Sequence, residues 1–136
     1  MRGSSKYQIL NSKQIQMTKI ENSKRYDLEE RTLRFAKEVI EFVTTLPKTV
    51  ANIEMMKQLI RSSGSVGSNY IEANEALSKK DFAVRIKICR KEAKESRYWL
   101  RLIEVREEDA EKRRQSLINE ATELMKIFGS IVEKTK

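Results

Sequence analysis

A single proline, Pro47, interrupts the 136 residues of this chain, and only four glycines accompany it. A β-sandwich of this length needs a turn roughly every ten residues, and turns draw heavily on proline and glycine. Long helices need neither residue. Apolar residues make up 39% of the chain, which is enough for one buried core and too many for a disordered chain. The sequence therefore predicts a single all-α domain.

Apolar residues recur at helical spacing in four segments, and a helix-start signal precedes each segment. The first begins at Asp27, an N-cap candidate with a glutamate three residues later, and Pro47 closes it. Thr49 and Ser78 are the N-cap candidates of the next two segments, and the acidic run Glu107–Asp109 precedes the last. Because the links are short, consecutive helices are expected to lie antiparallel in an up-down-up-down four-helix bundle.

The same spacing predicts which side chains form the core. The predicted core residues are Leu33, Ala36, Ile40 and Val43 of the first helix, Ile53, Met56, Ile60 and Ile71 of the second, Phe82, Ile86, Cys89, Ala93, Leu100 and Ile103 of the third, and Leu117, Ala121, Leu124, Phe128 and Ile131 of the fourth. Gly64 and Gly67 share the apolar face of the second helix, where they admit a close neighbour at a cost of about 1 kcal/mol each. Alternatively, residues 62–68 form a flexible linker that ends this helix.

The N-terminal region differs from the rest of the chain. Residues 1–26 are polar and basic and lack a sustained apolar period, so they are predicted to be a flexible tail outside the bundle of residues 27–136. Whether residues 1–4 belong to the natural chain is an open question. No apolar run approaches the roughly 20 residues of a membrane span, and no signal-peptide core is present. The single cysteine, Cys89, cannot form an internal disulfide, so a cytoplasmic protein that does not bind membranes is expected.

The chain contains no histidine. This absence excludes Ser-His-Asp and Cys-His catalysis, zinc sites that use imidazole, and the Glu-x-x-His di-iron bundle. Cys89 falls on a predicted core face, where a small buried hydrophobe is a better interpretation than a nucleophile. No catalytic residue, metal site or cofactor is therefore predicted, and the chain is not expected to be an enzyme.

The net charge of +8 is unevenly distributed along the chain. Residues 1–26 carry a net charge of +5, and residues 79–106 carry +6. On a helical wheel, one flank of the predicted third helix collects these cations. The candidate nucleic-acid-binding residues are Lys80, Lys87, Arg90, Lys91, Lys94, Arg97 and Arg101, with Tyr98 at the edge. Such a stripe can neutralise phosphates, and a tyrosine can stack on an unpaired base. Alternatively, the stripe is a solvated lysine-rich face.

The opposite flank of the third helix is apolar too, so that it and the core face together form an apolar arc over roughly half of the helix circumference. Its members are Val84, Ile88, Trp99 and Leu102, interleaved with two glutamates. An arc this wide favours a subunit interface, although the same side chains can instead close the edge of the core. Arg61 and Glu72 of the second helix are further interface candidates, because they can pair across a subunit boundary or within the bundle.

Four sequence motifs are similar to those of a known protein family. They are Tyr26–Arg31, Arg61–Tyr70 followed by Glu72 and Ala73, Ser78–Phe82, and Cys89–Leu100. Over about residues 26–134 the chain resembles a bacterial family of four-helix proteins that was first noticed in open reading frames within intervening sequences of 23S ribosomal RNA genes.

The resemblance implies a four-helix protomer that assembles as a homopentamer. It also implies kinship with the accessory variability protein of diversity-generating retroelements, a basic pentamer that binds nucleic acid and a reverse transcriptase. Kinship of fold does not by itself transfer function. The resulting hypothesis is a non-enzymatic, oligomeric accessory protein whose basic stripe binds RNA or DNA. The alternative is a structural or protein-interaction scaffold that does not bind nucleic acid.

Overall fold

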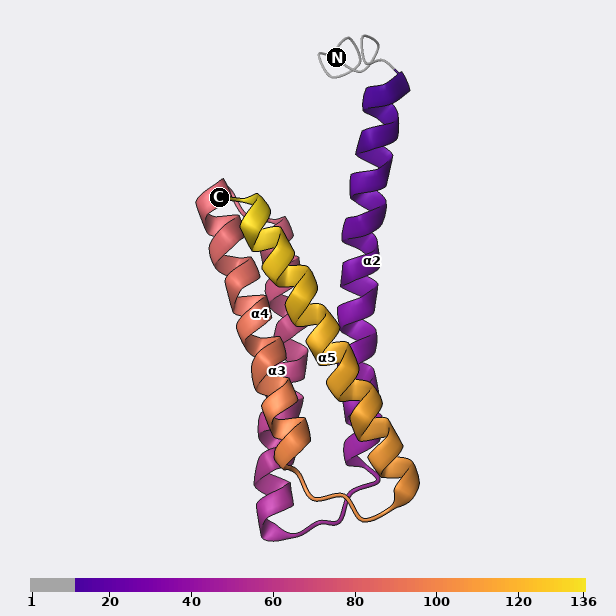
Figure 1. Cartoon of the computed structure of the whole chain (residues 1–136). Coiled ribbons are helices and arrows are strands. Elements are labelled where there is room, and N and C mark those ends of the chain that lie inside the picture. The colour runs from indigo at the N-terminus through magenta and orange to yellow at the C-terminus, as the bar shows by residue number, and fades with distance from the viewer. Residues whose placement is uncertain (1–11) are drawn as a thin grey trace.

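The computed structural model describes residues 12–136 of the chain, with side chains described from residue 27 onward. This part of the chain forms four helices and no strand: α2 (Ser12–Val43), α3 (Val50–Asn74), α4 (Lys79–Leu102) and α5 (Glu108–Lys134). Short links join them, and consecutive helices run in opposite directions (Figure 1). The predicted all-α, up-down-up-down four-helix bundle is confirmed.

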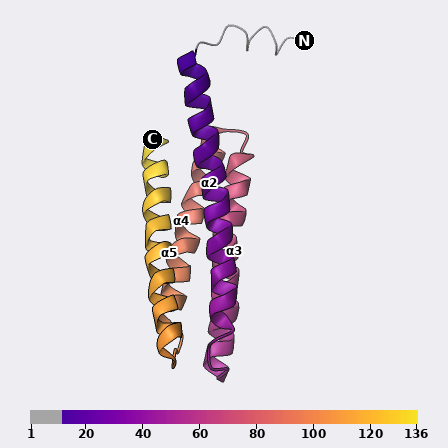
Figure 2. The same ribbon diagram turned by 90° about the vertical axis from the view of Figure 1, so that its right-hand side faces the viewer.

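The helices are arranged in a ring in which each contacts the next one in the chain and α5 returns to α2. The α3–α4 pair packs most extensively, and the α2–α5 pair packs least. Figure 1 shows α5 crossing α2 at an angle, so that the two helices separate toward the end that holds the C-terminus. Figure 2, turned by a quarter, shows α2 continuing beyond the ends of the other helices.

The predicted starts of three helices are confirmed. The side chain of Thr49 caps α3 by accepting a hydrogen bond from the backbone N–H of Asn52 at 3.1 Å. Ser78 caps α4 in the same way by accepting from the backbone N–H of Asp81 at 3.1 Å. The first turn of α5 is acidic, which is favourable next to the positive end of the helix dipole.

The predicted start of the first helix at Asp27 is wrong. Helix α2 already begins at Ser12, so Asp27 lies in its interior. Residues 12–26 contain neither glycine nor proline, and they are rich in Lys, Gln and Ile, so nothing in them stops a helix. An aspartate with a glutamate three residues later is compatible with a helix interior as well as with a cap. The part of the predicted tail before Ser12 lies outside the described residues.

The predicted core of α4 and α5 is confirmed. Ile86, Cys89, Ala93, Leu100 and Ile103 are buried on α4, and Phe82 packs at the edge of the core. Their partners on α5 are Leu117, Ala121, Leu124 and Phe128, which are buried, and Ile131, which is partly buried. The core also crosses the bundle, because the rings of Tyr70 on α3 and Phe128 on α5 lie 5.8 Å apart between centroids.

The predicted core face is wrong for much of α2 and α3. Leu33, Ile40, Ile53, Ile60 and Ile71 are 40–52% exposed. The buried residues are instead Thr32, Phe35, Val39 and Phe42 of α2 and Asn52, Leu59, Ser62, Ser63, Val66, Tyr70 and Ala73 of α3, and Val43 is buried as predicted. Helices α2 and α3 therefore each carry two stripes of apolar residues. The stripe that packs in the core also contains small hydroxyl residues.

The burial of these hydroxyl residues has a physical reason. The Thr32 hydroxyl donates to the Leu28 carbonyl at 2.8 Å, and the hydroxyls of Ser62 and Ser63 bond carbonyls one turn back in α3. Because each side chain satisfies its hydrogen bond within its own helix, it can be buried without an unpaired polar group. Small residues also allow α2 and α3 to approach closely.

Helix α3 is continuous through its two glycines, so the helix prediction is confirmed and the linker alternative is wrong. A Cβ atom placed on Gly67 would lie 2.9 Å from Oγ1 of Thr32, so α2 passes directly over this position. Gly64, one turn earlier, has open space beside it, with no atom within 4 Å of such a Cβ. Close packing thus accounts for Gly67 but not for Gly64.

One buried side chain, Asn52, connects the α2–α3 link to the α4–α5 link, which lie at the same end of the bundle. Asn52 is fully buried, and its Nδ2 donates to the carbonyls of Pro47 at 3.0 Å and Glu104 at 2.9 Å. Its Oδ1 accepts the backbone N–H of Glu104 at 2.9 Å. The α2–α3 and α4–α5 links are therefore fastened to each other through a single amide.

Candidate nucleic-acid interface

The outer side of α4 carries the predicted basic stripe. Five side chains spaced three or four residues apart are exposed there: Lys87, Lys91, Lys94, Tyr98 and Arg101. This spacing aligns them along one side of the helix over about 21 Å, at 1.5 Å per residue. Lys80, the second residue of the helix, is also exposed.

Two predicted stripe residues instead lean toward α5. Arg97 is partly buried and donates from Nη1 to the hydroxyl of Thr122 at 3.2 Å. Arg90 extends over Gly129, where a Cβ atom would lie 3.8 Å from its Nε. These two arginines of α4 therefore extend its positive charge toward α5.

The two glutamates of α4, Glu92 and Glu95, face away from this stripe. Glu95 accepts a hydrogen bond from Arg61 of α3 at 3.1 Å, and Glu92 lies 3.6 Å from the same guanidinium. Among the described side chains, no ion pair involves Lys87, Lys91 or Lys94. Because Glu92 and Glu95 are engaged on the α3 side, the charged side chains of the stripe between Lys87 and Arg101 are all cations.

Tyr98 of the basic stripe is paired with the neighbouring Trp99. The ring of Tyr98 is 58% exposed, and it meets the indole of Trp99 edge-on, with ring centroids 5.1 Å apart and an interplanar angle of 77°. Trp99 is partly buried and packs against the core, so it anchors the pair. One face of Tyr98 is thus held in a fixed orientation between the charges of Lys94 and Arg101.

Glu92 lies at the centre of a polar contact between α3 and α4. The residue is only 8% exposed, and its Oε2 accepts a hydrogen bond from the Ser65 hydroxyl at 3.2 Å. Its Oε1 is buried and has no hydrogen-bond partner among the described residues. The Arg61 guanidinium nearby supplies the compensating charge.

The contact continues along both helices. The hydroxyls of Ser62 and Ser96 lie 2.9 Å apart, and Arg85 of α4 donates to the Asn69 amide oxygen of α3 at 3.2 Å. These residues come mostly from the second and fourth sequence motifs, which therefore meet in space. Sequence reasoning missed the contact, although the serines recur at helical spacing on both segments.

The predicted interface residues are divided between two ends of the α3–α4 pair. Glu72, Val84 and Ile88 line a shallow hollow at one end, and Leu102 is half exposed at the other. Trp99 packs on the edge of the core, which is the alternative that the sequence left open. Arg61 pairs within the protomer with glutamates of α4 rather than with Glu72. Whether this flank binds another copy of the chain stays a prediction.

Cys89 is fully buried in the core, and burial raises the pKa of its thiol to about 12. The thiol is therefore uncharged at neutral pH, in agreement with the interpretation of Cys89 as a small buried hydrophobe. Within the described residues, no three histidine, cysteine or acidic side chains are placed to hold a metal ion. In the same part of the chain, no helix combines the length and the apolarity that crossing a membrane requires.

Comparisons with known proteins agree with this fold. The sequence model of the 23S rRNA-intervening sequence protein family matches residues 24–130. A crystal structure from Bacteroides thetaiotaomicron, described as a protein of unknown function from the S23 ribosomal protein family, is 33% identical and superposes with a TM-score of 0.67. The match covers 76% of this chain and 96% of the other. No curated protein matches the chain. The chain belongs to the 23S rRNA-intervening sequence protein family.

Proposed function

We propose that this protein is a non-enzymatic accessory protein that binds RNA through the outer face of α4. The observation that carries the proposal is the separation of charge on that helix: its lysines face solvent, and Glu92 and Glu95 face Arg61 on α3. A surface with one sign of charge attracts a polyanion and releases its counterions on binding. A face with interspersed acids would lose most of this attraction.

The aromatic pair supports a single-stranded ligand. Tyr98 lies in line with Lys91 and Lys94, so a strand whose phosphates contact the lysines can place an unpaired base on the tyrosine ring. The edge-on contact with Trp99 fixes the ring before binding, which reduces the entropy lost on stacking. A duplex offers no such base, because its bases are stacked on one another.

The names of the matching family and of the matching structure both refer to ribosomal RNA or to ribosomal proteins. This supports RNA over DNA as the polyanion. In this proposal the protein also assembles into a homo-oligomer, with five copies as the expected number. Repeating the α4 stripe around a ring would add the fields of the separate stripes and strengthen the attraction for a long strand.

A protein-interaction scaffold is the second candidate, and one observation favours it. Leu33 and Ile40 of α2, with Ile53, Ile60 and Ile71 of α3, remain substantially exposed on neighbouring helices. Exposed aliphatic side chains that gather on one face are typical of protein contacts. Under this hypothesis the α4 cations serve solubility, and RNA binding is absent at about 0.15 M salt.

The two candidates differ in a binding measurement on charge-reversed variants. Lys87→Glu, Lys91→Glu and Lys94→Glu together should weaken binding of a single-stranded RNA at least tenfold. A matched control reverses Lys37, Lys48 and Lys57, which are exposed on α2, the following link and α3. The control has the same net charge but an intact α4 stripe, so it should keep most of the affinity. An equal loss of RNA affinity in the two triple variants, or no RNA binding by the parent protein, would contradict the proposal.

A further inference from the structure

A pocket opens between α2 and α5, on a different side of the bundle from the basic stripe. It has a volume of about 670 Å³ and is lined by residues of all four helices. Its α5 lining residues lie between Lys126 and Lys134, in the part of α5 that diverges from α2 in Figure 1. Ligand sites in proteins commonly fall in the range of ~300–1,000 Å³, so this volume fits a small molecule.

The floor of the pocket is apolar. Tyr70 of α3 is 4% exposed there, and Leu28 of α2, Phe82 of α4 and Ile131 of α5 pack against the core beneath the opening. Because these side chains come from four different helices, the floor is fixed by the bundle itself. It offers an apolar body the kind of surface that preformed ligand pockets use.

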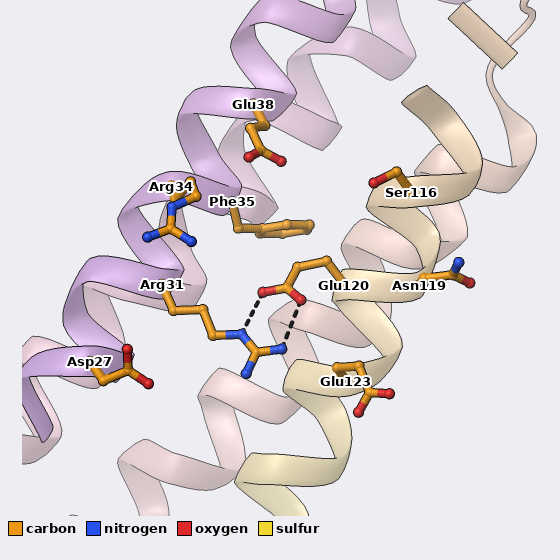
Figure 3. Close-up of a pocket in the computed structure, with 9 residues that line it drawn as sticks. All are labelled: Asp27, Arg31, Arg34, Phe35, Glu38, Ser116, Asn119, Glu120 and Glu123. Atoms are coloured by element: carbon orange, nitrogen blue, oxygen red, sulfur yellow. Dashed lines mark hydrogen bonds and ion pairs between the residues drawn. The ribbon is translucent and has the colours of Figure 1, made fainter. Parts of the chain in front are cut away.

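The rim of the pocket is cationic. Arg31, Lys126 and Lys134 line it, and Asp27 is its one acidic lining residue among those described. Glu120 holds Arg31 in place by accepting from its Nε at 2.7 Å and from its Nη2 at 2.8 Å. Figure 3 shows this pair from the side of a second pocket, which Arg31 and Asp27 also line. The third nitrogen, Nη1, points away from Glu120 in Figure 3 and makes no hydrogen bond with a described residue.

The lysines on the α5 side remain available to a ligand. Lys126 lies 4.0 Å from Glu123, which is a weak and solvent-exposed contact, and Lys134 has no ion pair among the described side chains. A flexible lysine of this kind can turn toward an anion at the opening. The rim thus combines one fixed guanidinium with two adjustable ammonium groups.

We propose that this pocket binds a small amphipathic anion, with its carboxylate or phosphate head at Arg31, Lys126 and Lys134 and its apolar body on the floor. The α5 residues that line the pocket lie between Lys126 and Lys134, which is only about 12 Å of helix at 1.5 Å per residue. A stretch this short suits a small molecule, because a docked helix would require contacts over several turns. The site is independent of the proposed RNA-binding face.

The test is calorimetric titration of the full chain with decanoate and with decyl phosphate, both below their micelle-forming concentrations. At least one should bind saturably with one molecule per protomer. Acetate has the anionic group without the alkyl chain, and decanol has the alkyl chain without the charge. Both should bind at least tenfold more weakly. The stronger of the two anions identifies the preferred head group. If neither anion binds saturably, or if decanol binds as tightly as they do, the proposal is wrong.

Rim variants locate the binding within the protein. Lys126→Glu with Lys134→Glu should weaken binding of the anion at least tenfold, because both lysines line the opening. The matched control, Lys48→Glu with Lys112→Glu, makes the same change in net charge at exposed positions that do not line the pocket, and should bind like the parent. All four positions are exposed, so circular dichroism should show an unchanged helix content. Equal affinities of the two double variants would overturn the assignment of this pocket.

Discussion

Gly67 of α3 lies directly against Thr32 of α2, so that a Cβ atom at position 67 would be 2.9 Å from the threonine Oγ1. The threonine hydroxyl is already bonded to the Leu28 carbonyl of its own helix, which leaves it little freedom to move. The contact explains why a helix tolerates a glycine here, and it fixes the distance between α2 and α3.

Substitution of Gly67 should therefore destabilise the protein. Gly67→Leu forces a side chain into the α2–α3 contact, and we expect a loss of ~1–3 kcal/mol in the free energy of unfolding from overpacking. The matched control is Gly64→Ala, which has open space around it and should raise stability by up to about 1 kcal/mol through helix propensity. Urea denaturation of the three proteins measures both changes. Similar effects of the two substitutions would contradict the packing described here.

The starts of α3, α4 and α5 could be predicted from the sequence because their signals are local. A serine or threonine side chain caps its own helix three residues on, and no other part of the chain is needed. The cores of α4 and α5 were predictable as well, since each of these helices has one dominant apolar stripe, which is the one that is buried.

The core face of α3 could not be predicted, because two apolar stripes compete there. Ile53, Ile60 and Ile71 form the more hydrophobic stripe, yet Leu59 and Val66 are the residues that pack. The outcome depends on how closely α2 approaches at Gly67, which is a property of two helices and not of one periodicity. The α3–α4 polar contact was missed for the same reason, since Glu92 and Ser65 lie 27 residues apart in the chain.

Removal of the Asn52 side chain should destabilise the end of the bundle that holds the α2–α3 and α4–α5 links. Asn52→Ala removes three hydrogen bonds, to the carbonyls of Pro47 and Glu104 and from the backbone N–H of Glu104, and each contributes about 0.5–1.5 kcal/mol. We expect a loss of at least ~2 kcal/mol in the free energy of unfolding. Asn119→Ala, at an exposed position on α5, should change stability little. Thermal or urea denaturation that shows equal stability for the two variants would refute the role given to Asn52.

The buried thiol of Cys89 predicts a pH-dependent stability. Its pKa in the folded protein, about 12, lies above the value of 9.0 for a free thiol, so folding favours the protonated form. This contribution is fully present below about pH 9 and is lost as the pH rises toward 12. The stability advantage of the parent protein over Cys89→Ala should therefore shrink over this interval. A constant difference in unfolding free energy between pH 8 and pH 11 would contradict the burial effect.

The burial of Cys89 also predicts that its thiol is alkylated slowly in the folded protein. Iodoacetamide reacts with the thiolate, and the folded protein presents neither the thiolate nor access to the sulfur near pH 8. Mass spectrometry should find Cys89 unmodified in the native protein and fully modified in concentrated urea. Comparable rates under both conditions would show that the bundle opens readily around α4.

Assembly can be measured directly by light scattering. We expect a mass of about five times the 15.9 kDa protomer for the unmodified protein. Val84→Glu with Leu102→Glu should dissociate the oligomer, because each places an unpaired charge in the predicted interface. Both residues are about half exposed in the protomer, so its fold should survive the change. Leu33→Glu with Ile40→Glu, on α2, is the matched control. A protomer mass for the parent protein, or dissociation by the control pair alone, would exclude the α4 flank as the interface.

The salt dependence of RNA binding tests the central claim most directly. For single strands, the logarithm of the binding constant falls with the logarithm of salt concentration with a slope of about −0.7 for each phosphate neutralised. Lys87→Gln, Lys91→Gln and Lys94→Gln together should therefore reduce the magnitude of the parent slope by about 2 for each protomer in contact with the strand. The same substitutions at Lys37, Lys48 and Lys57 should leave the slope unchanged. Equal slopes for the parent and the α4 variant would contradict the assignment of the α4 stripe as the RNA-binding face.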